Sequence, residues 1–320
     1  MDLDVHHATS KTALLAMTKA LNGEATATKG KADLPMLDYT DTDETSLADF
    51  KKFGDAAQAW AARNPQLSAD RIADVAIAAM ITVSPDCHTA YINKVRQVFR
   101  SRVENVTGSG PMIPGGAAVF GPDANSMQAK VLPNGIAYIT FAQWAINGTY
   151  NVTVQLRAAL DKALAAGARY WLFDLRGNPG GNGADLVASW FLNGEATLKT
   201  TVKTGNAGTA TANKDVRLPA AYQLPMAVVL NGRSASATEV FALSLKENKR
   251  ATLVGATTVG CLGAETPSAM SDGSEIDVAV EEYIGAQTGS AFNNKGVPPD
   301  VAADDASAVD KAIAILLAQH

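Results

Sequence analysis

The chain has 320 residues, of which 18% are charged, and its net charge is −5 at pH 7. A chain of this length can bury one large hydrophobic core or two smaller ones. No run of lysine and arginine forms a basic patch, which argues against a nucleic-acid partner. No stretch approaches the roughly 18 apolar residues of a membrane-spanning helix. We therefore expect a folded protein that neither binds nucleic acid nor spans a membrane.

The first part of the chain predicts three amphipathic helices. Ser10 begins the first, which runs to about Leu21, and a polar loop over 23–45 follows. Ser46 begins the second helix and Ser68 the third, because a serine before an apolar periodic run is a typical N-cap. The apolar residues recur at helical spacing, which is typical of a face packed against a core.

Beyond these helices, strands and helices alternate, which predicts an N-terminal helical domain over 1–93 and an α/β domain over 94–320. Repeated strand-helix-strand units give a partly parallel sheet, with its ligand site at the carboxyl ends of the strands. Residues 104–128 are predicted as a connecting segment and 203–218 as a polar loop. The predicted strands cover 131–141, 170–175, 226–231, 251–254 and 274–280, and the predicted helices cover 152–166, 184–192, 237–248 and a last one capped by Asp305.

Ser236 stands where a buried strand turns into a helix. The apolar run 226–231 precedes it, and a helix from Ala237 follows. A serine at such a junction can act as a nucleophile, and the Ala237 N–H in the first helical turn can bind an oxyanion. Ser236 and Glu239 also have the spacing of a capping box, in which the serine only closes the helix. The local sequence leaves both interpretations open.

A glycine-rich turn follows a second buried strand. The strand Tyr170–Leu175 leads into Arg176–Gly183, which holds four glycines. Glycine lets the backbone approach a ligand closely and adopt positive φ angles. The turn lacks the Gly-Lys-Ser/Thr of a P-loop and the spacing of a dinucleotide fingerprint. Nucleotide binding is therefore not expected.

Two motifs together, Asp174–Gly181 and Ser234–Glu239, closely resemble those of the carboxy-terminal processing protease and tricorn core family of serine peptidases, also called tail-specific proteases. The resemblance continues in the same order through Asp86–Thr89, Arg250–Gly255 and Gly296–Asp300. It implies an α/β fold with a ClpP/crotonase-like βαβ core, a mixed, partly parallel sheet and a small N-terminal helical domain. It also implies peptide hydrolysis without a cofactor or a metal.

Carried over to this chain, the resemblance makes Ser236 the nucleophile. The N–H groups of Ala237 and of a glycine in the pair Gly180 and Gly181 are then the oxyanion donors. One branch of the family uses a lysine 25 residues after the serine as its general base. This chain has Cys261 there, and a cysteine cannot replace that desolvated lysine, so a Ser-Lys dyad is not expected.

The tricorn-like branch takes its base from an Asp-x-His segment, and His88 stands in that context here. A neutral imidazole can take the serine proton and return it to the leaving amine. The third member in this branch is a glutamate, whose place is taken by Asn293. An asparagine orients the imidazole but supplies no charge to stabilise imidazolium. The alternatives for this role are Glu265, Glu281 and Glu282.

Many family members carry a PDZ domain between the histidine segment and the first core strand. The residues between Thr89 and Val131 are too few for one. Recognition of a substrate carboxyl terminus by a PDZ domain is therefore not expected.

Cys87 adjoins the expected base and Cys261 stands at the position of the family's lysine, so both are expected near the active site. In an exported protein they could form a disulfide. The alternative is two buried thiols that pack as small apolar residues. The segment Met1–Ala8 lacks the features of a signal peptide. Because many relatives work outside the cytosol, we expect a secreted or periplasmic protein whose leader is absent from this chain, with a cytoplasmic location as the alternative.

The sequence thus predicts a serine endopeptidase that forms an acyl-enzyme on Ser236, uses His88 as general base and acts on a peptide or protein substrate. One alternative is a catalytically weak protein of the same fold that binds apolar small molecules. Another is a crotonase-like acyl-coenzyme A enzyme, which would have no need of Ser236 and His88 together. Cleavage preference and oligomeric state are left open.

Overall fold

The computed structural model describes residues 10–39, 47–83, 86–100, 108–202 and 208–319. They belong to two compact units, each described by itself. Unit 1 comprises Met1–Val103 and Glu265–Val280, and unit 2 comprises Glu104–Ala264 and Glu281–His320. The chain therefore enters unit 1 twice. The domain boundary expected between residues 93 and 94 stays a prediction.

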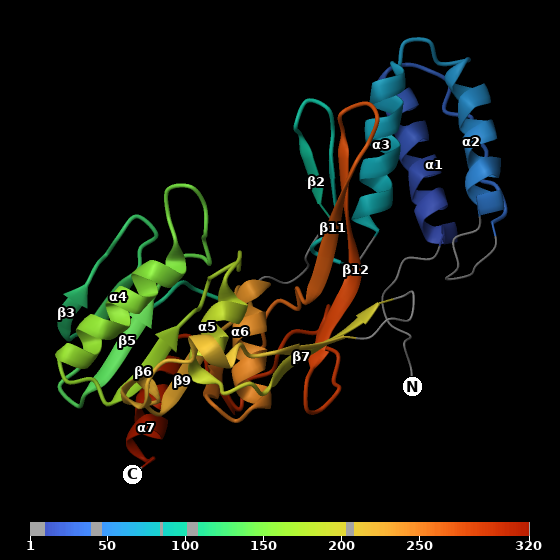
Figure 1. Ribbon diagram of the computed structural model, residues 1–320. Coiled ribbons are helices and arrows are strands. Elements are labelled where there is room, and N and C mark those ends of the chain that lie inside the picture. The colour runs from blue at the N-terminus through green and yellow to red at the C-terminus, as the bar shows by residue number, and fades with distance from the viewer. Residues whose placement is uncertain (1–9, 40–46, 84–85, 101–107, 203–207, 320) are drawn as a thin grey trace. The chain divides into compact units, whose positions relative to one another are not determined.

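Within its described residues, unit 1 contains the helices α1 (Ser10–Ala27), α2 (Leu47–Ala61) and α3 (Ala69–Thr82) (Figure 1). They enclose a core in which Leu14, Leu21 and Trp60 are fully buried. Unit 1 also contains β1 (Ala90–Ile92) and β2 (Val98–Arg100), and β1 pairs antiparallel with β2 and with the start of β12 (Glu275–Gly285).

The helix boundaries of unit 1 test the sequence predictions. Ser68 is the N-cap of α3 as predicted, and its side chain accepts the Arg71 N–H at 3.1 Å. The predicted end of α1 near Leu21 is wrong, because the helix continues to Ala27. A glycine inside a helix costs only about 1 kcal/mol, and the burial of Ala25 beyond it favours the longer helix. The predicted cap Ser46 lies outside the described residues.

Unit 2 is built, within the described residues, on a seven-stranded sheet of order β13-β10-β9-β6-β5-β4-β3. The strands from β13 to β5 run parallel, and β4 and β3 continue the sheet antiparallel. This confirms the predicted mixed, partly parallel α/β core. The strands are β3 (Ala117–Phe120), β4 (Gln128–Val131), β5 (Ile136–Thr140), β6 (Tyr170–Asp174), β9 (Met226–Leu230), β10 (Thr252–Gly255) and β13 (Val301–Ala302).

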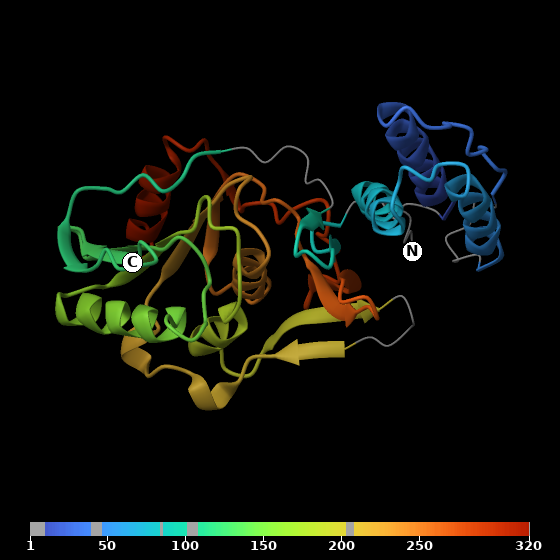
Figure 2. The ribbon, with the colours of Figure 1, turned by 90° about the horizontal axis from the view of Figure 1, so that it is seen from above.

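Helices cover both faces of this sheet (Figure 2). On one face lie α4 (Val152–Ala165), α5 (Ala184–Phe191) and α6 (Ala237–Glu247), and on the other lies α7 (Ala308–Leu317). In β6, Trp171 and Phe173 pack toward the three helices, whereas Tyr170 and Leu172 pack toward α7. Strands buried on both faces have continuous apolar sequences. In the described part of the chain, no helix has both the length and the apolar character needed to cross a membrane.

A smaller antiparallel arrangement in unit 2 joins β7 (Ala196–Val202) to β8 (Gly208–Thr211) and to the second half of β12. The strand β11 (Gly263–Ala269), most of which belongs to unit 1, also pairs with β12. Two 3-10 turns follow β8, at Lys214–Val216 and Ala220–Tyr222. The predicted polar loop over 203–218 is therefore wrong for 208–211, while 203–207 lie outside the described residues. The exposed strand β8 is held by main-chain pairing, which leaves no apolar pattern to detect.

Two further predictions need correction. Of the predicted strand 131–141, residues 136–140 form β5, whereas Val131 ends β4 and a turn lies between them, in which Leu132 N–H donates to Ile136 O at 2.9 Å. The predicted cap Asp305 is wrong, because Ser307 is the N-cap of α7. The side chain of Asp305 is engaged with other segments, which the local sequence could not indicate.

Phe241 on α6 is fully buried, with its ring centroid 5.2 Å from that of Trp144 and 5.6 Å from that of Phe173. Phe241→Ala should lower the free energy of unfolding by about 3–5 kcal/mol, because it removes buried apolar surface and leaves a cavity. Val154→Ala is the control, since Val154 is exposed on α4 and the change should stay within about 0.5 kcal/mol. Urea unfolding measures the free energy of unfolding of both variants. Equal losses would contradict the placement of Phe241 in the core.

Candidate active site

Ser236 lies in the turn that leads from the carboxyl end of β9 into α6. Its φ of 54° and ψ of −119° fall outside the regions open to most L-residues. Such a conformation costs on the order of 1–3 kcal/mol and persists only where its surroundings hold it. The capping box that the sequence allowed is present, because the Glu239 carboxylate accepts the Ser236 N–H at 2.8 Å and the Ser236 side chain faces the Glu239 N–H. A serine that only caps a helix has extended backbone angles, so the backbone favours the nucleophile interpretation.

Gly180 allows the glycine-rich turn to pack against Ser236. A Cβ at Gly180 would lie 2.6 Å from the Cβ of Ser236 and 2.8 Å from the nitrogen of Ala237. The φ of Gly180 is +99°, in the left-handed region that side chains rarely adopt. Space and conformation therefore both require glycine here.

Asn178 cross-links the two turns. It is 1% exposed, and its main-chain carbonyl accepts the Ala235 N–H at 3.0 Å. Its Oδ1 accepts the Gly180 N–H at 3.0 Å and the Thr238 hydroxyl at 2.9 Å. Its Nδ2 donates to Phe141 O at 3.1 Å. One buried carboxamide thus joins the glycine-rich turn, the start of α6 and the end of β5.

Two main-chain N–H groups at this place have no acceptor within the described residues, those of Ala237 and Gly181. The Ala237 N–H belongs to the first turn of α6, where a helix offers no acceptor. The Gly180 N–H differs, because Asn178 already accepts it. Unit 2 therefore brings the predicted nucleophile together with two available donors.

Glu239 ties the Ser236 turn to the loop that carries Cys261. Its carboxylate is fully buried and accepts the N–H groups of Ser236 at 2.8 Å, of Gly260 at 2.7 Å and of Cys261 at 2.7 Å, and also the Thr258 hydroxyl. Burial raises the pKa of Glu239, and these four donors oppose the rise. Sequence reasoning assigned this residue only to the cap. A glutamate among the apolar residues of a buried helix is the signal that could have revealed its wider role.

His88 lies in unit 1, in the segment that leads from α3 to β1, and is partly buried. Its N–H donates to Asp86 Oδ1 at 2.7 Å, and its ring Nδ1 lies 3.7 Å from Cys87 Sγ. Asp86 thus fixes the main chain of this turn. Because Ser236 belongs to unit 2, the pairing of the two side chains stays a prediction.

Asn293 lies in unit 2, in the loop after β12, where its Oδ1 accepts the Leu262 N–H at 2.9 Å. It therefore supports the same loop as Glu239. The glutamate alternatives are Glu281 and Glu282, partly buried on β12, and Glu265, exposed on β11. Which of these four orients the imidazole stays a prediction.

Cys87 and Cys261 are both disulfide-bonded. The alternative of two unpaired thiols is therefore wrong. Asp86, Cys87 and His88 offer ligand atoms within 4.8 Å of one another. A thiolate, not a disulfide sulfur, binds metal, and the two remaining ligands are fewer than the three or four that hold zinc. We assign no metal to this cluster.

The family model described as Peptidase family S41 matches residues 135–303. The chain therefore belongs to peptidase family S41, a family of serine-type peptidases. The match begins at the start of β5 and ends just after β13, so it includes Ser236, both turns and Asn293.

Curated relatives match the same region. The chain is 34% identical over 169 residues to a carboxyl-terminal-processing protease of Synechocystis, covering 52% of this chain and 37% of that protein. It is 31% identical over 153 residues to the carboxy-terminal processing protease CtpA of Bacillus subtilis, covering 47% and 32%. The chain thus spans about a third of the length of these relatives. A lipoprotein structure from Streptococcus agalactiae matches with a TM-score of 0.61 over 100% of both chains at 14% identity, which concerns the fold alone.

Glu239→Gln should lower the free energy of unfolding by about 2 kcal/mol, because the amide NH₂ would face a buried donor and leave it unpaired. Glu247→Gln is the matched control on α6. Its carboxylate accepts the N–H groups of Gln287 and Thr288 at 2.8 and 2.9 Å in an exposed setting, where water can replace the lost bonds. Urea unfolding compares the two variants, and equal stability would contradict the role given to Glu239.

Proposed function

We propose that this chain is a serine endopeptidase that hydrolyses peptide bonds through an acyl-enzyme on Ser236, with His88 as general base. The observation that carries the proposal is the strained backbone of Ser236 beside the available N–H groups of Ala237 and Gly181. Strained conformations of this kind cluster at active sites. Membership of a peptidase family supports the peptide bond as the target.

In the acylation step, Ser236 Oγ attacks the carbonyl carbon of the scissile peptide while His88 takes the hydroxyl proton. The N–H groups of Ala237 and Gly181 donate to the oxyanion that forms. Preorganised donors of this kind are worth about 10²–10³ in kcat each. The imidazolium then gives its proton to the leaving amine, and the C–N bond breaks.

In the deacylation step, His88 takes a proton from a water molecule, which attacks the ester carbonyl on Ser236. The same two N–H groups stabilise the second oxyanion. When the ester C–O bond breaks, the proton returns to Ser236 Oγ and a carboxylate product leaves. Asn293 is our candidate for fixing the imidazole tautomer, a role that needs only a carbonyl oxygen.

We further propose that the protein works outside the cytoplasm, in a secreted or periplasmic setting, on a polypeptide substrate. The disulfide-bonded state of Cys87 and Cys261 supports this location, since disulfides persist in oxidising compartments. The printed names of the curated relatives describe processing at carboxyl termini. Cleavage near a substrate's carboxyl terminus is accordingly the activity to test first.

A fluorophosphonate should label the native chain at Ser236, because the probe reacts with an activated serine. Ser236→Ala should abolish both labelling and peptide cleavage. Ser68→Ala is the control, since Ser68 caps α3 in unit 1 and both signals should persist. An unlabelled native chain that takes up an apolar fluorophore would instead favour the small-molecule binding protein of the same fold.

For the peptide substrate, kcat/KM should rise with pH through a single ionisation, because only a neutral imidazole can accept the serine proton. His88→Ala should lower kcat/KM on the order of 10³-fold or more. Asn293→Ala should cost less, because asparagine only orients the ring. A rate that survives His88→Ala and keeps climbing at high pH would point to a lysine base.

A further inference from the structure

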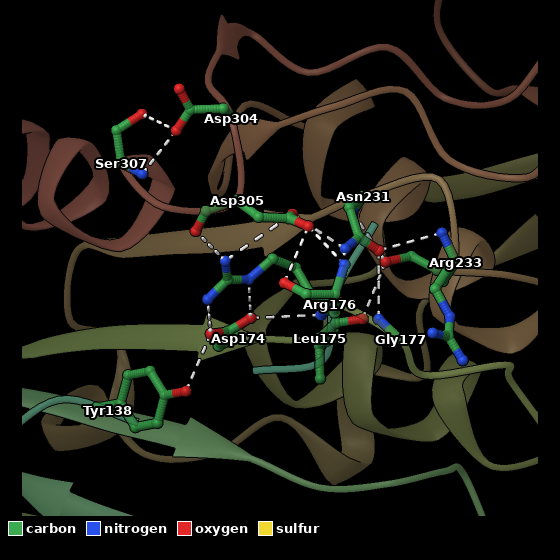
Figure 3. Close-up of polar contacts among 12 residues, drawn as sticks. Tyr138, Asp174, Leu175, Arg176, Gly177, Asn231, Arg233, Asp304, Asp305 and Ser307 are labelled. Carbon is green, nitrogen blue, oxygen red and sulfur yellow. Dashed lines mark hydrogen bonds and ion pairs between the residues drawn. The ribbon is translucent and has the colours of Figure 1, made fainter. Parts of the chain in front are cut away.

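Asn231, which the mechanism above does not use, connects the two active-site turns (Figure 3). It directly follows β9 and is 1% exposed. Its Oδ1 accepts the N–H groups of Gly177 at 3.3 Å and Arg233 at 3.0 Å. The Gly177 amide stands at the start of the glycine-rich turn, and the Arg233 amide stands at the start of the turn that carries Ser236. Its Nδ2 donates to Ser109 O at 2.7 Å and to Asp305 Oδ1 at 3.0 Å, so the carboxamide uses both donors and both acceptor positions.

Asp305 holds the donor side of this carboxamide (Figure 3). Its Oδ2 also accepts the N–H and the hydroxyl of Ser109. Arg176 donates to its main-chain carbonyl and forms a double hydrogen bond with Asp174 at 2.9 and 2.7 Å. Burial alone would raise the pKa of Asp305, but the hydrogen bonds from Ser109 and Asn231 and the charge of Arg176 hold it below its usual value. These contacts therefore favour the ionised form of Asp305.

Residues 108–110 can approach these groups because Gly108 carries no side chain. A Cβ at Gly108 would lie 2.3 Å from Asn231 Nδ2, and the φ of Gly108 is +120°. A Cβ at Gly177 would lie 3.4 Å from the Cα of Gly110. The segment 108–110, Asn231 and Asp305 together form what we call the clamp.

We propose that Asn231 and Asp305 are positioning residues for the reaction at Ser236, an inference that rests on the proposed function. The two turns leave neighbouring strands, and the Asn231 carboxamide joins their first amides, so it sets the spacing between Ser236 and Gly181. Oxyanion donors act over about 2.7–3.1 Å, and a misplacement of about 1 Å can cost 10²-fold in rate.

Asp305 fixes which way the carboxamide faces. With its oxygen and nitrogen exchanged, Asn231 would set an acceptor against Ser109 O and the Asp305 carboxylate, and donors against two N–H groups. The carboxylate therefore selects the orientation that holds both turns.

The test compares variants by the rate of fluorophosphonate labelling and by kcat and KM for a peptide. Asn231→Leu removes all four hydrogen bonds at similar size. Asp305→Asn replaces one of its two acceptor oxygens, which face Asn231 and Ser109, with an amide donor. Each should lower the labelling rate and kcat by about 10- to 100-fold with little change in KM. Thermal unfolding identifies the variants that are folded at the assay temperature. A purely structural role would lower the unfolding temperature and leave kcat of the folded protein unchanged.

Asp304→Asn is the matched control from the same loop. The Asp304 carboxylate accepts the N–H and hydroxyl of Ser307 at 2.8 and 2.6 Å, at the start of α7 (Figure 3), so its labelling rate should equal that of the parent chain. If a clamp variant does not fold, Gly108→Ala is tested in its place, because the added methyl group would displace Asn231. Folded clamp variants labelled at the parent rate would overturn this inference alone. A parent chain that is never labelled would overturn the proposed function.

Discussion

The candidate active site of unit 2 depends on how closely two turns approach each other at the carboxyl ends of β6 and β9. Gly180 leaves no room for a side chain against Ser236, and Ser236 adopts a strained backbone at the point of contact. A strain of about 1–3 kcal/mol is offset by a few buried hydrogen bonds, each with a net worth of about 0.5–1.5 kcal/mol. Asn178 and Glu239 supply these buried hydrogen bonds. The strain is therefore held locally, by the turns themselves.

The buried ion pair of Asp174 and Arg176 is better explained by placement than by stability. Both side chains are fully buried, and the Tyr138 hydroxyl donates to Asp174 Oδ2 at 2.9 Å. Burial and the adjacent carboxylate raise the pKa of Tyr138, so the phenol remains a donor. Desolvation of such a pair offsets much of its attraction, and well-packed apolar residues are often as stable. The pair instead gives the end of β6 a single arrangement, and Asp305 extends it to the clamp.

The sequence predicted correctly those elements whose signal lies within their own residues. The strands β6 and β9 were predicted because burial on both faces gives unbroken apolar runs, and the Ser236 turn was predicted from the junction of strand and helix. Asp305 was mistaken for a helix cap because an acid before an apolar helix is a typical cap, whereas its partners Asn231 and Ser109 are 74 and 196 residues away. The wider role of Glu239 was missed for the same reason. Side-chain bonds between distant segments leave no periodic trace in the sequence.

The loop that carries Cys261 clarifies which segment can supply the base. Family members of one branch place a lysine at this position, but here residues 256–264 contain no lysine. The loop is instead bound to Glu239 through Gly260 and Cys261, and Cys261 is disulfide-bonded. Groups held in this way can brace the Ser236 turn, but none of them can take a proton from a hydroxyl. For the acyl-enzyme that we propose on Ser236, the base is therefore sought in another segment, and our proposal assigns it to His88, the one histidine among the described residues.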